Sequence, residues 1–307
     1  MSELKSIVAE FTCRAEPMAL ATAVRTIGST YRKPGARLLL DTRGRVAGSL
    51  SSGCLEDEVA ELARPVIAGG PPILSSFDLR PRFGCNGTIE ILIERVTPGN
   101  AFLTEAAQML AARVAWKAVT VFSSSTQPLG SAAWKVGAPP EDEAFVQTLL
   151  PPVRVVVIGD GLDNDALIQF AAVLGWDIVL AASPAEIPAP DARTAVVVKA
   201  HKFGRDYAAL QALLALPVAY VGLMGPARRK QQLLSLLLDD GLLSPNAPLT
   251  QLFGPAGIDV GAETPAEIAL SIVAEIQAVL AGHAGGSLRD KRGSIHFPTR
   301  DLQPVPE

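Results

Sequence analysis

One short motif constrains the fold of this chain more than any other feature. Residues 153–158 (VRVVVI) are almost all apolar, which is typical of a β-strand buried on both faces. Gly159 and Gly161 follow at once, and a helical pattern begins a few residues later. Glycines at these positions let a phosphate group approach the amino-terminus of the next helix. The motif therefore predicts a strand–turn–helix unit of the kind that binds dinucleotides.

The rest of the second half repeats this alternation of strands and helices. Apolar runs at residues 178–182, 194–200 and 219–223 predict further strands, and a capping box at Thr264 predicts the start of the last long helix. Such alternation predicts a doubly wound parallel sheet, an α/β fold of the Rossmann type. Ligands of such sheets bind where the strands end, and the residues expected to face a ligand there are Gly159, Gly161, His201 and Gly222.

Two departures from the dinucleotide-binding pattern bear on the choice of ligand. Asn164 stands in place of the third small residue, and the second strand ends at Ala182 without the carboxylate that holds a ribose hydroxyl. Asp160, Asp163 and Asp165 bring negative charge to the position of a pyrophosphate. These features argue against NAD(P). They leave open another nucleotide-bearing or phosphorylated ligand, and a Rossmann domain that has lost nucleotide binding.

The first half predicts a mixed α/β domain. Apolar periodicity favours helices at residues 3–15, 55–67 and 101–113, and a short helix between the proline pairs at 139–140 and 151–152. Segments between the helices predict strands at residues 19–24, 36–40, 45–49, 73–78, 88–94, 118–122 and 131–135. The second proline pair marks a boundary, so we expect a first domain over 1–150, a Rossmann-like domain over 151–282 and an irregular tail over 283–307.

Composition excludes several classes of protein. The chain has 307 residues, 49% of them hydrophobic, and a net charge of −4, so nothing attracts it as a whole to nucleic acid or anionic membranes. It contains no run of about 18 uncharged apolar residues, as a membrane span would require. Acidic residues interrupt the first 16 residues, where a secretion signal would be apolar. Three widely spaced cysteines do not make a disulfide framework, and a cytoplasmic protein with free thiols is expected.

A cluster of basic residues in the first domain predicts an anion site. Residues 25–45 hold six basic side chains against one acid. Gly28, Ser29 and Thr30 add backbone and hydroxyl donors to the cluster. Guanidinium groups combined with such donors suit a phosphate or a carboxylate.

The arginines of this cluster differ in what is expected of them. For Arg25 and Arg37, which flank the glycine loop, an anion site and a solvated strand face are both open. For Arg43 and Arg45 the solvated face is preferred. If Arg37 lies at the surface and holds a phosphate, its truncation should leave the melting temperature nearly unchanged.

Two cysteines of this domain follow a glycine in a turn. Gly53 is expected to cap a helix that begins just after Cys54, with Glu56 as its capping-box partner. A helix N-terminus lowers the pKa of a thiol, but Glu56 and the two acids near it offset that effect. Cys54 and Cys85 are therefore expected to matter through their position rather than through strong nucleophilicity. Cys13, on the first helix, is expected to be part of the core.

The sequence contains no recognisable catalytic or metal-binding pattern. All three histidines lie after residue 200, so a zinc site in the first domain would need an unusual set of ligands. Walker A, GxSxG and HExxH patterns are missing. We assign neither a catalytic residue nor a metal ligand.

Five segments together resemble one known family. In the first domain they are VRTIGSTYRKPGARLLL (24–40), GSLSSGCLEDEV (48–59) and GCNGTIEILIE (84–94). In the second they are AYVGLMGPARRK (219–230) and GIDVGAETPAEIALSIVAEI (257–276). They are similar to the signatures of the XdhC/CoxI family, whose members are maturation factors for xanthine dehydrogenase and related molybdenum hydroxylases. The second domain departs from the family pattern, with Leu162 in place of a common histidine and Lys202 in place of an aspartate.

The resemblance implies a non-catalytic chaperone that binds the molybdenum cofactor, as molybdopterin or its cytosine dinucleotide form. It implies help with cofactor sulfuration and delivery to an apo molybdenum hydroxylase, with a cysteine desulfurase as a further partner. Exposed sheet edges in an apolar chain favour a homodimer. Arg25 and Arg37 would hold the phosphate end, while Cys54 and Cys85 would face the metal. The full set of expected cofactor contacts is Arg25, Gly28, Ser29, Thr30, Arg37, Ser52, Gly53, Cys54, Cys85, Asn86, Gly159, Gly161, His201 and Gly222.

Two other functions stay open at this point. The chain could be an NAD(P)-dependent oxidoreductase that uses its Rossmann domain, although the missing ribose carboxylate argues against this. It could also be an interaction scaffold that binds no cofactor. Thermal stabilisation by molybdopterin, by NAD(P) or by neither would separate the three functions.

Overall fold

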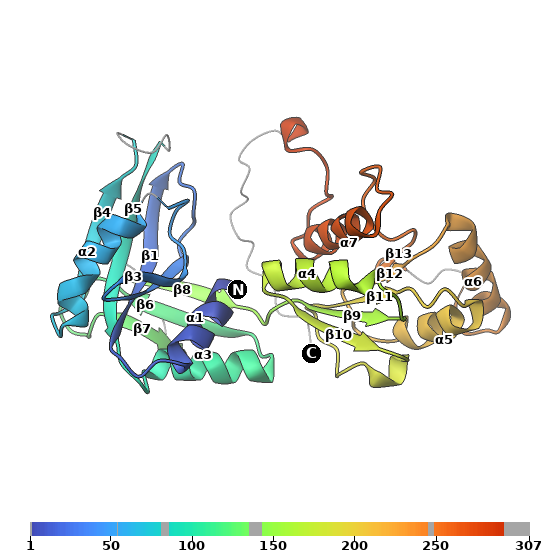
Figure 1. The fold of residues 1–307 in the computed structure, drawn as a ribbon, viewed down its shortest axis with the longest axis horizontal. Helices are drawn as coiled ribbons and strands as arrows, with labels where there is room; N and C mark the ends of the chain where they lie inside the picture. Colours follow the sequence, from blue (N-terminus) through green and yellow to red (C-terminus); the bar gives the residue numbers. More distant parts are fainter. Residues whose placement is uncertain (1, 54, 81–85, 135–142, 245–248, 292–307) are drawn as a thin grey trace. The chain divides into compact units, whose positions relative to one another are not determined.

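A computed structural model describes residues 2–53, 55–80, 86–134, 143–244 and 249–291 of the chain (Figure 1). The chain divides into two compact units. The first unit contains residues 1–153 and 172–177, and the second contains residues 154–171 and 178–307. Within the described part of the chain, no helix has the length and hydrophobicity needed to span a bilayer.

An antiparallel sheet of five strands forms the centre of the first unit. Its strand order is β3-β2-β1-β5-β4, and β1 pairs with both β2 and β5. The bounds are β1 Met18–Gly28, β2 Arg37–Asp41, β3 Gly44–Gly48, β4 Ile73–Asp78 and β5 Gly87–Val96. β1 continues four residues beyond its predicted end, because the pairing with β5 runs as far as Gly28 opposite Gly87.

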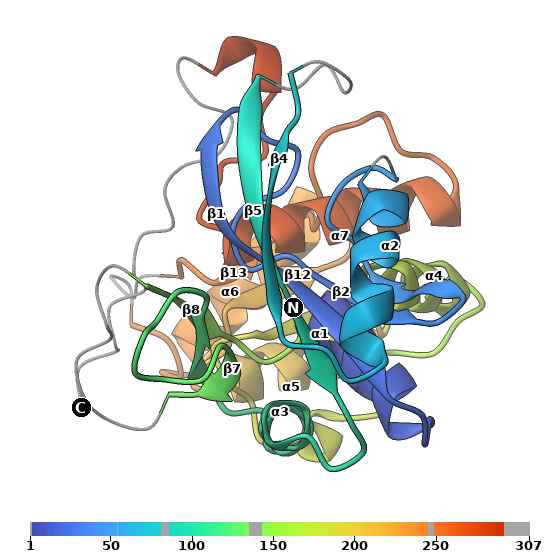
Figure 2. The ribbon, with the colours of Figure 1, turned by 90° about the vertical axis from the view of Figure 1, so that its left-hand side faces the viewer.

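The two faces of this sheet pack against different elements. Helix α2 (Glu56–Ile67) covers one face, where Val59 and Val66 join Leu38 and Ile91 in one hydrophobic cluster. Helices α1 (Ser2–Thr12) and α3 (Ala101–Ala112) cover the other face and pack on residues such as Leu39 (Figures 1 and 2). Because neighbouring residues of a strand point to opposite faces, Leu38 and Leu39 belong to separate cores.

A second, smaller sheet completes the first unit. Its order is β7-β6-β8, with bounds β6 Trp116–Val121, β7 Gly130–Ala133 and β8 Ala144–Leu149. The sequence predicts a short helix where β8 lies, and this prediction is wrong. Antiparallel pairing with β6, from Trp116 opposite Leu149 to Val121 opposite Ala144, satisfies the backbone of the segment, and Leu149 is buried in the same core as α1 and α3. Tertiary pairing overrides the local helical preference.

The second unit confirms the predicted Rossmann-like α/β fold. Its strand order is β10-β9-β11-β12-β13, and β11 runs parallel to both β9 and β12. The bounds are β9 Arg154–Ile158, β10 Asp177–Ala181, β11 Thr194–Val198, β12 Tyr220–Leu223 and β13 Leu252–Phe253. The chain leaves β9 toward β10 on one side and later returns to β11 on the other. The ends of β9 and β11 therefore form a topological switch point, the usual ligand position in such sheets.

Helices cover both faces of this parallel sheet. Helices α5 (Phe203–Leu213) and α6 (Ala227–Asp239) pack on one face, in a cluster that includes Val196 of β11. Helices α4 (Asn164–Leu174) and α7 (Pro265–Leu280) lie on the opposite face in Figure 1. The predicted capping box is confirmed: Thr264 accepts from the Glu267 N–H at 3.3 Å, and Glu267 accepts from the Thr264 N–H at 2.8 Å. Two short 3-10 helices complete the fold, Pro184–Glu186 and Leu288–Asp290.

Candidate functional sites

Three loops of the first unit, which we call the rim loops, carry most of the residues expected to contact a ligand. Their described residues are 28–36 at the end of β1, 49–53 and 55 before α2, and 79–80 and 86–87 between β4 and β5. Figure 2 shows the end of β1, the start of β5 and the start of α2 toward the same end of the sheet. The Ser29 N–H donates to the Asn86 carbonyl at 3.2 Å, which joins the first and third loops. Gly28 permits this close approach, because a Cβ there would lie 2.4 Å from the same carbonyl oxygen.

The second rim loop is organised around the carboxylate of Glu56. This carboxylate accepts from the N–H groups of Leu50 at 3.0 Å, Ser51 at 2.9 Å and Leu55 at 3.2 Å, and from the Ser51 hydroxyl. The Ser51 hydroxyl oxygen also accepts from the Gly53 N–H at 3.0 Å. A buried carboxylate with this many donors holds the backbone of Leu50, Ser51 and Leu55 in place.

The hydrogen bonds to Glu56 decide its charge. Burial alone raises the pKa of this carboxyl group, but the hydrogen bonds from Ser51 and from the backbone outweigh burial and lower the pKa below its usual value. The expected cap is wrong in detail: α2 begins at Glu56 itself, with Leu55 at the cap position and no side-chain cap. Glu56 is therefore turned back toward the residues before the helix.

Two residues of the second rim loop face outward. Ser52 and Gly53 are exposed, and a Cβ on Gly53 would meet no atom of the described residues within 4 Å. Cys54 and Cys85 lie outside the described residues, so their predicted positions are not observed. The prediction for Cys13 is wrong. This thiol is exposed just beyond the end of α1 and does not belong to the core.

Arg25 lies at the surface of β1 in a partly neutralised environment. Its guanidinium pairs with the Glu90 carboxylate at 3.2 Å, and its side chain is 48% exposed. The guanidinium carbon lies 5.0 Å from the centre of the Phe122 ring, a cation–π distance. Arg25 is thus positioned and open to solvent, and both properties suit contact with an anionic ligand.

Arg37 does not lie at the surface, so the prediction that depends on its exposure is wrong. It is 3% exposed, donates to Gln147 Oε1 at 2.8 Å and lies against the Phe102 ring. Burial lowers its pKa to about 10, and the charge of Glu94 opposes that shift. The Nε and Nη2 atoms of Arg37 and the Oε1 atom of Glu94 have no protein partner among the described residues. Arg37 belongs to the junction between the two sheets of the first unit, and its expected contact with a ligand stays a prediction.

The remaining arginines of the basic cluster are held within the first unit. Arg32 pairs with Glu3 of α1 and so ties the first rim loop to that helix. Arg43 pairs with Asp41 at 3.1 Å, and Arg45 donates to the Gly48 carbonyl at 2.9 Å. Thr30 also bonds inward, donating to the Arg32 carbonyl at 2.7 Å. The positive charge of this cluster is therefore largely balanced by the chain itself.

A buried lysine lies at the carboxyl edge of the second unit's sheet, which is the side on which the strands end. Lys199 directly follows β11 and is 1% exposed. Its ammonium forms an ion pair with the Asp163 carboxylate and donates to Asn164 Oδ1 at 2.7 Å. Asn164 Nδ2 in turn donates to the Gly159 carbonyl at 3.2 Å. Asn164, which stands in place of the third small residue of the motif, thus links the end of β9, the start of α4 and the end of β11.

Two of the four residues predicted at this edge pack against the chain itself. A Cβ on Gly159 would lie 2.6 Å from the Lys199 carbonyl oxygen, so this glycine allows β9 and β11 to end close together. A Cβ on Gly222 would lie 2.6 Å from the Tyr220 ring, whose hydroxyl donates to Glu275 at 2.6 Å. Gly222 makes room for that ring, and its expected contact with a ligand stays a prediction. His201 is exposed, as a ligand contact must be.

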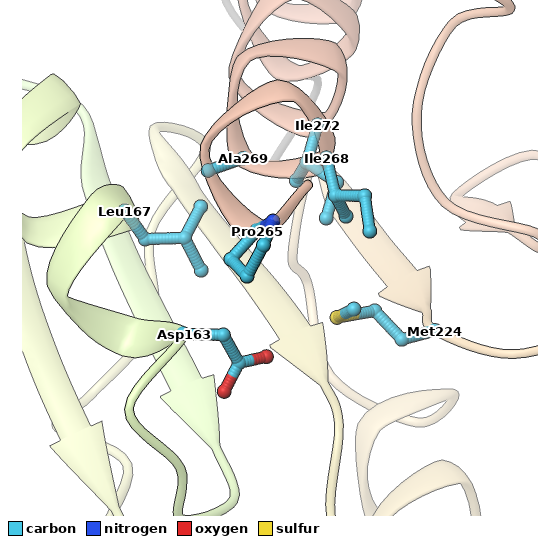
Figure 3. Close-up of a pocket in the computed structure, with 7 residues that line it drawn as sticks. All are labelled: Asp163, Leu167, Met224, Pro265, Ile268, Ala269 and Ile272. Carbon is cyan, nitrogen blue, oxygen red and sulfur yellow. The ribbon is translucent and has the colours of Figure 1, made fainter. Parts of the chain in front are cut away.

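A small pocket opens beside this network (Figure 3). Its cavity volume is about 60 Å³, space for a few water molecules or a small chemical group. Its lining is mostly apolar, with Asp163 as the charged member beside Leu167, Met224, Pro265, Ile268, Ala269 and Ile272. In the described ranges, no group of three or more His, Cys, Asp and Glu side chains is arranged to hold a metal ion.

The roles of three charged groups are not predicted from the sequence. They are the carboxylates of Glu56 and Glu94 and the ammonium of Lys199. The sequence pattern marks Glu56 only as a helix cap, and it assigns no role to Glu94 or Lys199. Lys199 does leave a signal, because it directly follows an apolar strand at the edge where Rossmann-like sheets bind ligands. Glu94 also interrupts an apolar strand, and charged residues are rarely buried without a partner.

Comparison with known protein families matches both units. Residues 155–276 match the model of the XdhC Rossmann domain, and residues 13–78 match the model of the XdhC and CoxI family. The range 13–78 contains Arg25 and the first two rim loops. The range 155–276 contains Lys199 and its partners Asp163 and Asn164.

Similar proteins extend over most of the chain. A protein from Bacillus subtilis (strain 168), described as a probable subunit of xanthine dehydrogenase, is 26% identical over 85% of this chain and 92% of the relative. The molybdenum cofactor insertion chaperone PaoD from Escherichia coli (strain K12) is 26% identical, over 85% of this chain and 82% of the relative. A crystal structure described as a xanthine dehydrogenase from Bacillus halodurans matches with a TM-score of 0.75 and 25% identity, over 92% of this chain and 96% of that chain.

Proposed function

Because this chain belongs to the XdhC/CoxI family, we propose that it is a maturation factor for a molybdenum hydroxylase. It binds the molybdenum cofactor, takes part in its sulfuration and delivers it to an apo enzyme of the xanthine dehydrogenase type. It acts as a chaperone in the cytoplasm and catalyses no reaction on a substrate of its own. The names of two relatives support this role, since one is a cofactor insertion chaperone and the other is assigned to xanthine dehydrogenase.

One observation supports the second rim loop as the place where the cofactor binds. Glu56 holds the second rim loop by accepting three backbone N–H groups, and that loop presents Ser52 and Gly53 to solvent. Cys54 is covalently joined to Gly53 and to Leu55, whose N–H is one of the three. We propose that Cys54 contacts the bound cofactor.

The residues of the rim fit the chemistry of the cofactor. When bound, the cofactor supplies a molybdenum centre with dithiolene sulfurs at one end and an anionic phosphate at the other. The half-exposed Arg25 and the exposed hydroxyl of Ser29 suit the phosphate, as does the side-chain amide of Asn86. Thiolates are the soft ligands that suit the metal–sulfur end, and this is the role we propose for Cys54 and Cys85.

The partners follow from the same role. We propose that the receiving hydroxylase contacts the rim, where Ile27 is 63% exposed and Tyr31 is 61% exposed. Exposed large side chains next to polar groups are typical of protein interfaces. A cysteine desulfurase is the proposed source of sulfur, and a homodimer is the proposed assembly.

A cysteine exchange tests the proposal. The wild type and Cys54→Ser are each co-expressed with an apo hydroxylase, and both the hydroxylase activity and the molybdenum and pterin that copurify with this chain are measured. Serine is similar in size to cysteine but is not a soft ligand. Cys54→Ser should therefore fold normally, retain less cofactor and fail to activate the hydroxylase.

The chain provides a matched control. Cys13→Ser changes an exposed thiol just beyond α1, away from the rim loops, and should behave as the wild type does. Equal cofactor content and equal activation by Cys54→Ser and Cys13→Ser would overturn the role of Cys54. Absence of any cofactor from the wild type would overturn the proposed function itself.

A further inference from the structure

The Rossmann-like fold of the second unit implies a nicotinamide dinucleotide, and the geometry of its glycine loop can be compared with that requirement. In dinucleotide-binding loops the second glycine leaves the backbone open, so that the pyrophosphate can approach it. The helix after the loop directs its amino-terminus at the same phosphate groups. Both features have counterparts here, in Gly161 and in helix α4, which begins at Asn164.

In this chain the open side of Gly161 is already filled. A Cβ on Gly161 would lie 2.4 Å from Asp163 Oδ1 and 3.5 Å from Lys199 Nζ. The carboxylate of Asp163 therefore covers the backbone at the point where a pyrophosphate would approach. Asp163 also directly precedes α4, where the helix dipole favours a negative charge. A carboxylate of the chain itself thus has the two surroundings that a bound phosphate would have.

Lys199 holds this carboxylate in place. The lysine side chain has no exposed surface, and its ammonium contacts Asp163 and Asn164. An ammonium buried this deeply needs a charged partner, and Asp163 is the acid that pairs with it. Burial alone raises the pKa of Asp163, but the hydrogen bond and charge of Lys199 outweigh burial and lower the pKa, so the Asp163 carboxyl group is ionised at neutral pH.

The place of the ribose is also taken by the chain. An acid at the end of the second strand would hold the ribose hydroxyl groups. Here the chain has Ala182, whose carbonyl accepts from Arg205 Nη2 at 2.7 Å and whose N–H donates to Glu186 at 3.0 Å. The guanidinium of Arg205 also lies 3.6 Å from the Asp160 carboxylate. Neither the pyrophosphate position nor the ribose position of a dinucleotide is free.

We propose that Asp163 and Lys199 determine the specificity of this loop: Asp163 occupies the anion position of the glycine loop, and Lys199 fixes it there, so that the second unit rejects NAD(P) and other dinucleotides. The loop is an anion site whose occupant is part of the chain. Removal of the carboxylate alone exposes a buried ammonium and a helix amino-terminus to an added phosphate. Removal of both charges leaves no such attraction.

The test measures binding of three probes, sodium pyrophosphate, NADH and NADPH, by titration calorimetry and by nicotinamide fluorescence. The full-length wild type should show no saturable binding of any probe. Asp163→Ala should bind pyrophosphate saturably, at least about tenfold more tightly than the weakest affinity that the measurement detects, which corresponds to ~1.4 kcal/mol. The double variant Asp163→Ala with Lys199→Met should lose that gain.

Two results would overturn the proposal. One is binding of NADH or pyrophosphate by the wild type as tight as that of Asp163→Ala, because the loop would then be open already. The other is a folded Asp163→Ala protein with no gain for pyrophosphate. If Asp163→Ala does not fold, Asp163→Ser carries the same expectation, since its hydroxyl is smaller than a carboxylate and still accepts from Lys199. The outcome is independent of the proposed chaperone role, which rests on the rim of the first unit.

Discussion

Two glycine loops of this protein look alike in sequence and differ in what they leave open. The loop before α2 and the loop before α4 each place a glycine at positive φ, 120° at Gly53 and 156° at Gly161, and each has a carboxylate within three residues of it. In the first loop Glu56 turns inward and accepts backbone N–H groups, which leaves the face of Gly53 open. In the second loop Asp163 turns over Gly161 and covers it.

The difference shows that a glycine in a turn does not identify a binding site. The direction of the nearest carboxylate decides whether the glycine faces solvent or the chain. In the first unit the inward carboxylate is satisfied by the N–H groups of its own loop. In the second unit a buried ammonium, that of Lys199, draws the carboxylate across the glycine. Four experiments test this difference between the two loops, and they are given in order of decreasing expected effect.

The largest effect is expected for Glu56→Ala. The substitution leaves the N–H groups of Leu50 and Ser51 without their acceptor, and the Leu55 N–H keeps only the Ser51 hydroxyl oxygen, at 3.1 Å. An unpaired buried polar group costs about 1–3 kcal/mol, so a total loss of about 3 kcal/mol in the free energy of unfolding is expected once the loop relaxes into water. Thermal unfolding measured by calorimetry checks the loss. A melting temperature equal to that of the wild type would mean that Glu56 does not organise the loop.

Asp163→Ala should have the next largest effect. It leaves the Lys199 ammonium buried with Asn164 as its remaining partner, and breaking a buried ion pair in this way costs several kcal/mol. Because the Asp163 side chain is 30% exposed, we expect a smaller loss of about 2 kcal/mol. Adding Lys199→Met should restore part of the stability, since methionine needs no charged partner. Additive losses in the double variant would show that the two groups do not act as a pair.

A matched pair of glycine substitutions should differ by less. Gly53→Ala and Gly161→Ala both place a side chain on a backbone with positive φ, but among the described residues the new methyl group meets an atom within 4 Å only at Gly161. We expect Gly161→Ala to cost about 1 kcal/mol more in unfolding free energy, because Asp163 must move. The excess should vanish in an Asp163→Ala background. Equal costs for the two single variants, measured by urea unfolding, would show that Gly161 is as open as Gly53.

The smallest effect is expected from pH. The folded state lowers the pKa of Glu56 below its ordinary value of 4.5, so Glu56 contributes stability above that value and loses it as the pH falls through the lowered pKa. The difference in unfolding free energy between the wild type and Glu56→Gln should be full near pH 7 and should shrink on acidification below about pH 4.5. Urea unfolding at a series of pH values measures it. A difference that grew in acid would contradict the inward, ionised carboxylate.

Much of the fold could be predicted from the sequence, because its strands and helices carry strong local patterns. The apolar run before Gly159 and the capping box at Thr264 are signals of this kind, and both elements are confirmed. β8 could not be predicted in the same way. Its strand character depends on pairing with β6, which lies more than twenty residues earlier in the chain.

The candidate sites were harder to predict than the fold, because charge alone does not show where a side chain points. Arg25 and Arg37 belong to the same basic cluster and the same strand pair, yet Arg25 is 48% exposed and Arg37 is buried between two sheets. The negative charge of Asp163 at the glycine loop was expected. The reason that it stays there was not, because Lys199 lies thirty-six residues later and reaches Asp163 only through the parallel pairing of β9 with β11.

One measurement tests most directly the claim that the rim, and not the glycine loop of the second unit, holds the cofactor. Ser52 and Leu162 are exposed residues beside Gly53 and Gly161, and Leu162 is 92% exposed, so a tryptophan at either position can block its own loop with little cost in folding. Ser52→Trp and Leu162→Trp are purified from a molybdenum-replete host, and molybdenum and pterin per chain are compared with the wild type. We predict that Ser52→Trp loses most of its cofactor and that Leu162→Trp retains it; loss in Leu162→Trp with retention in Ser52→Trp would contradict the account.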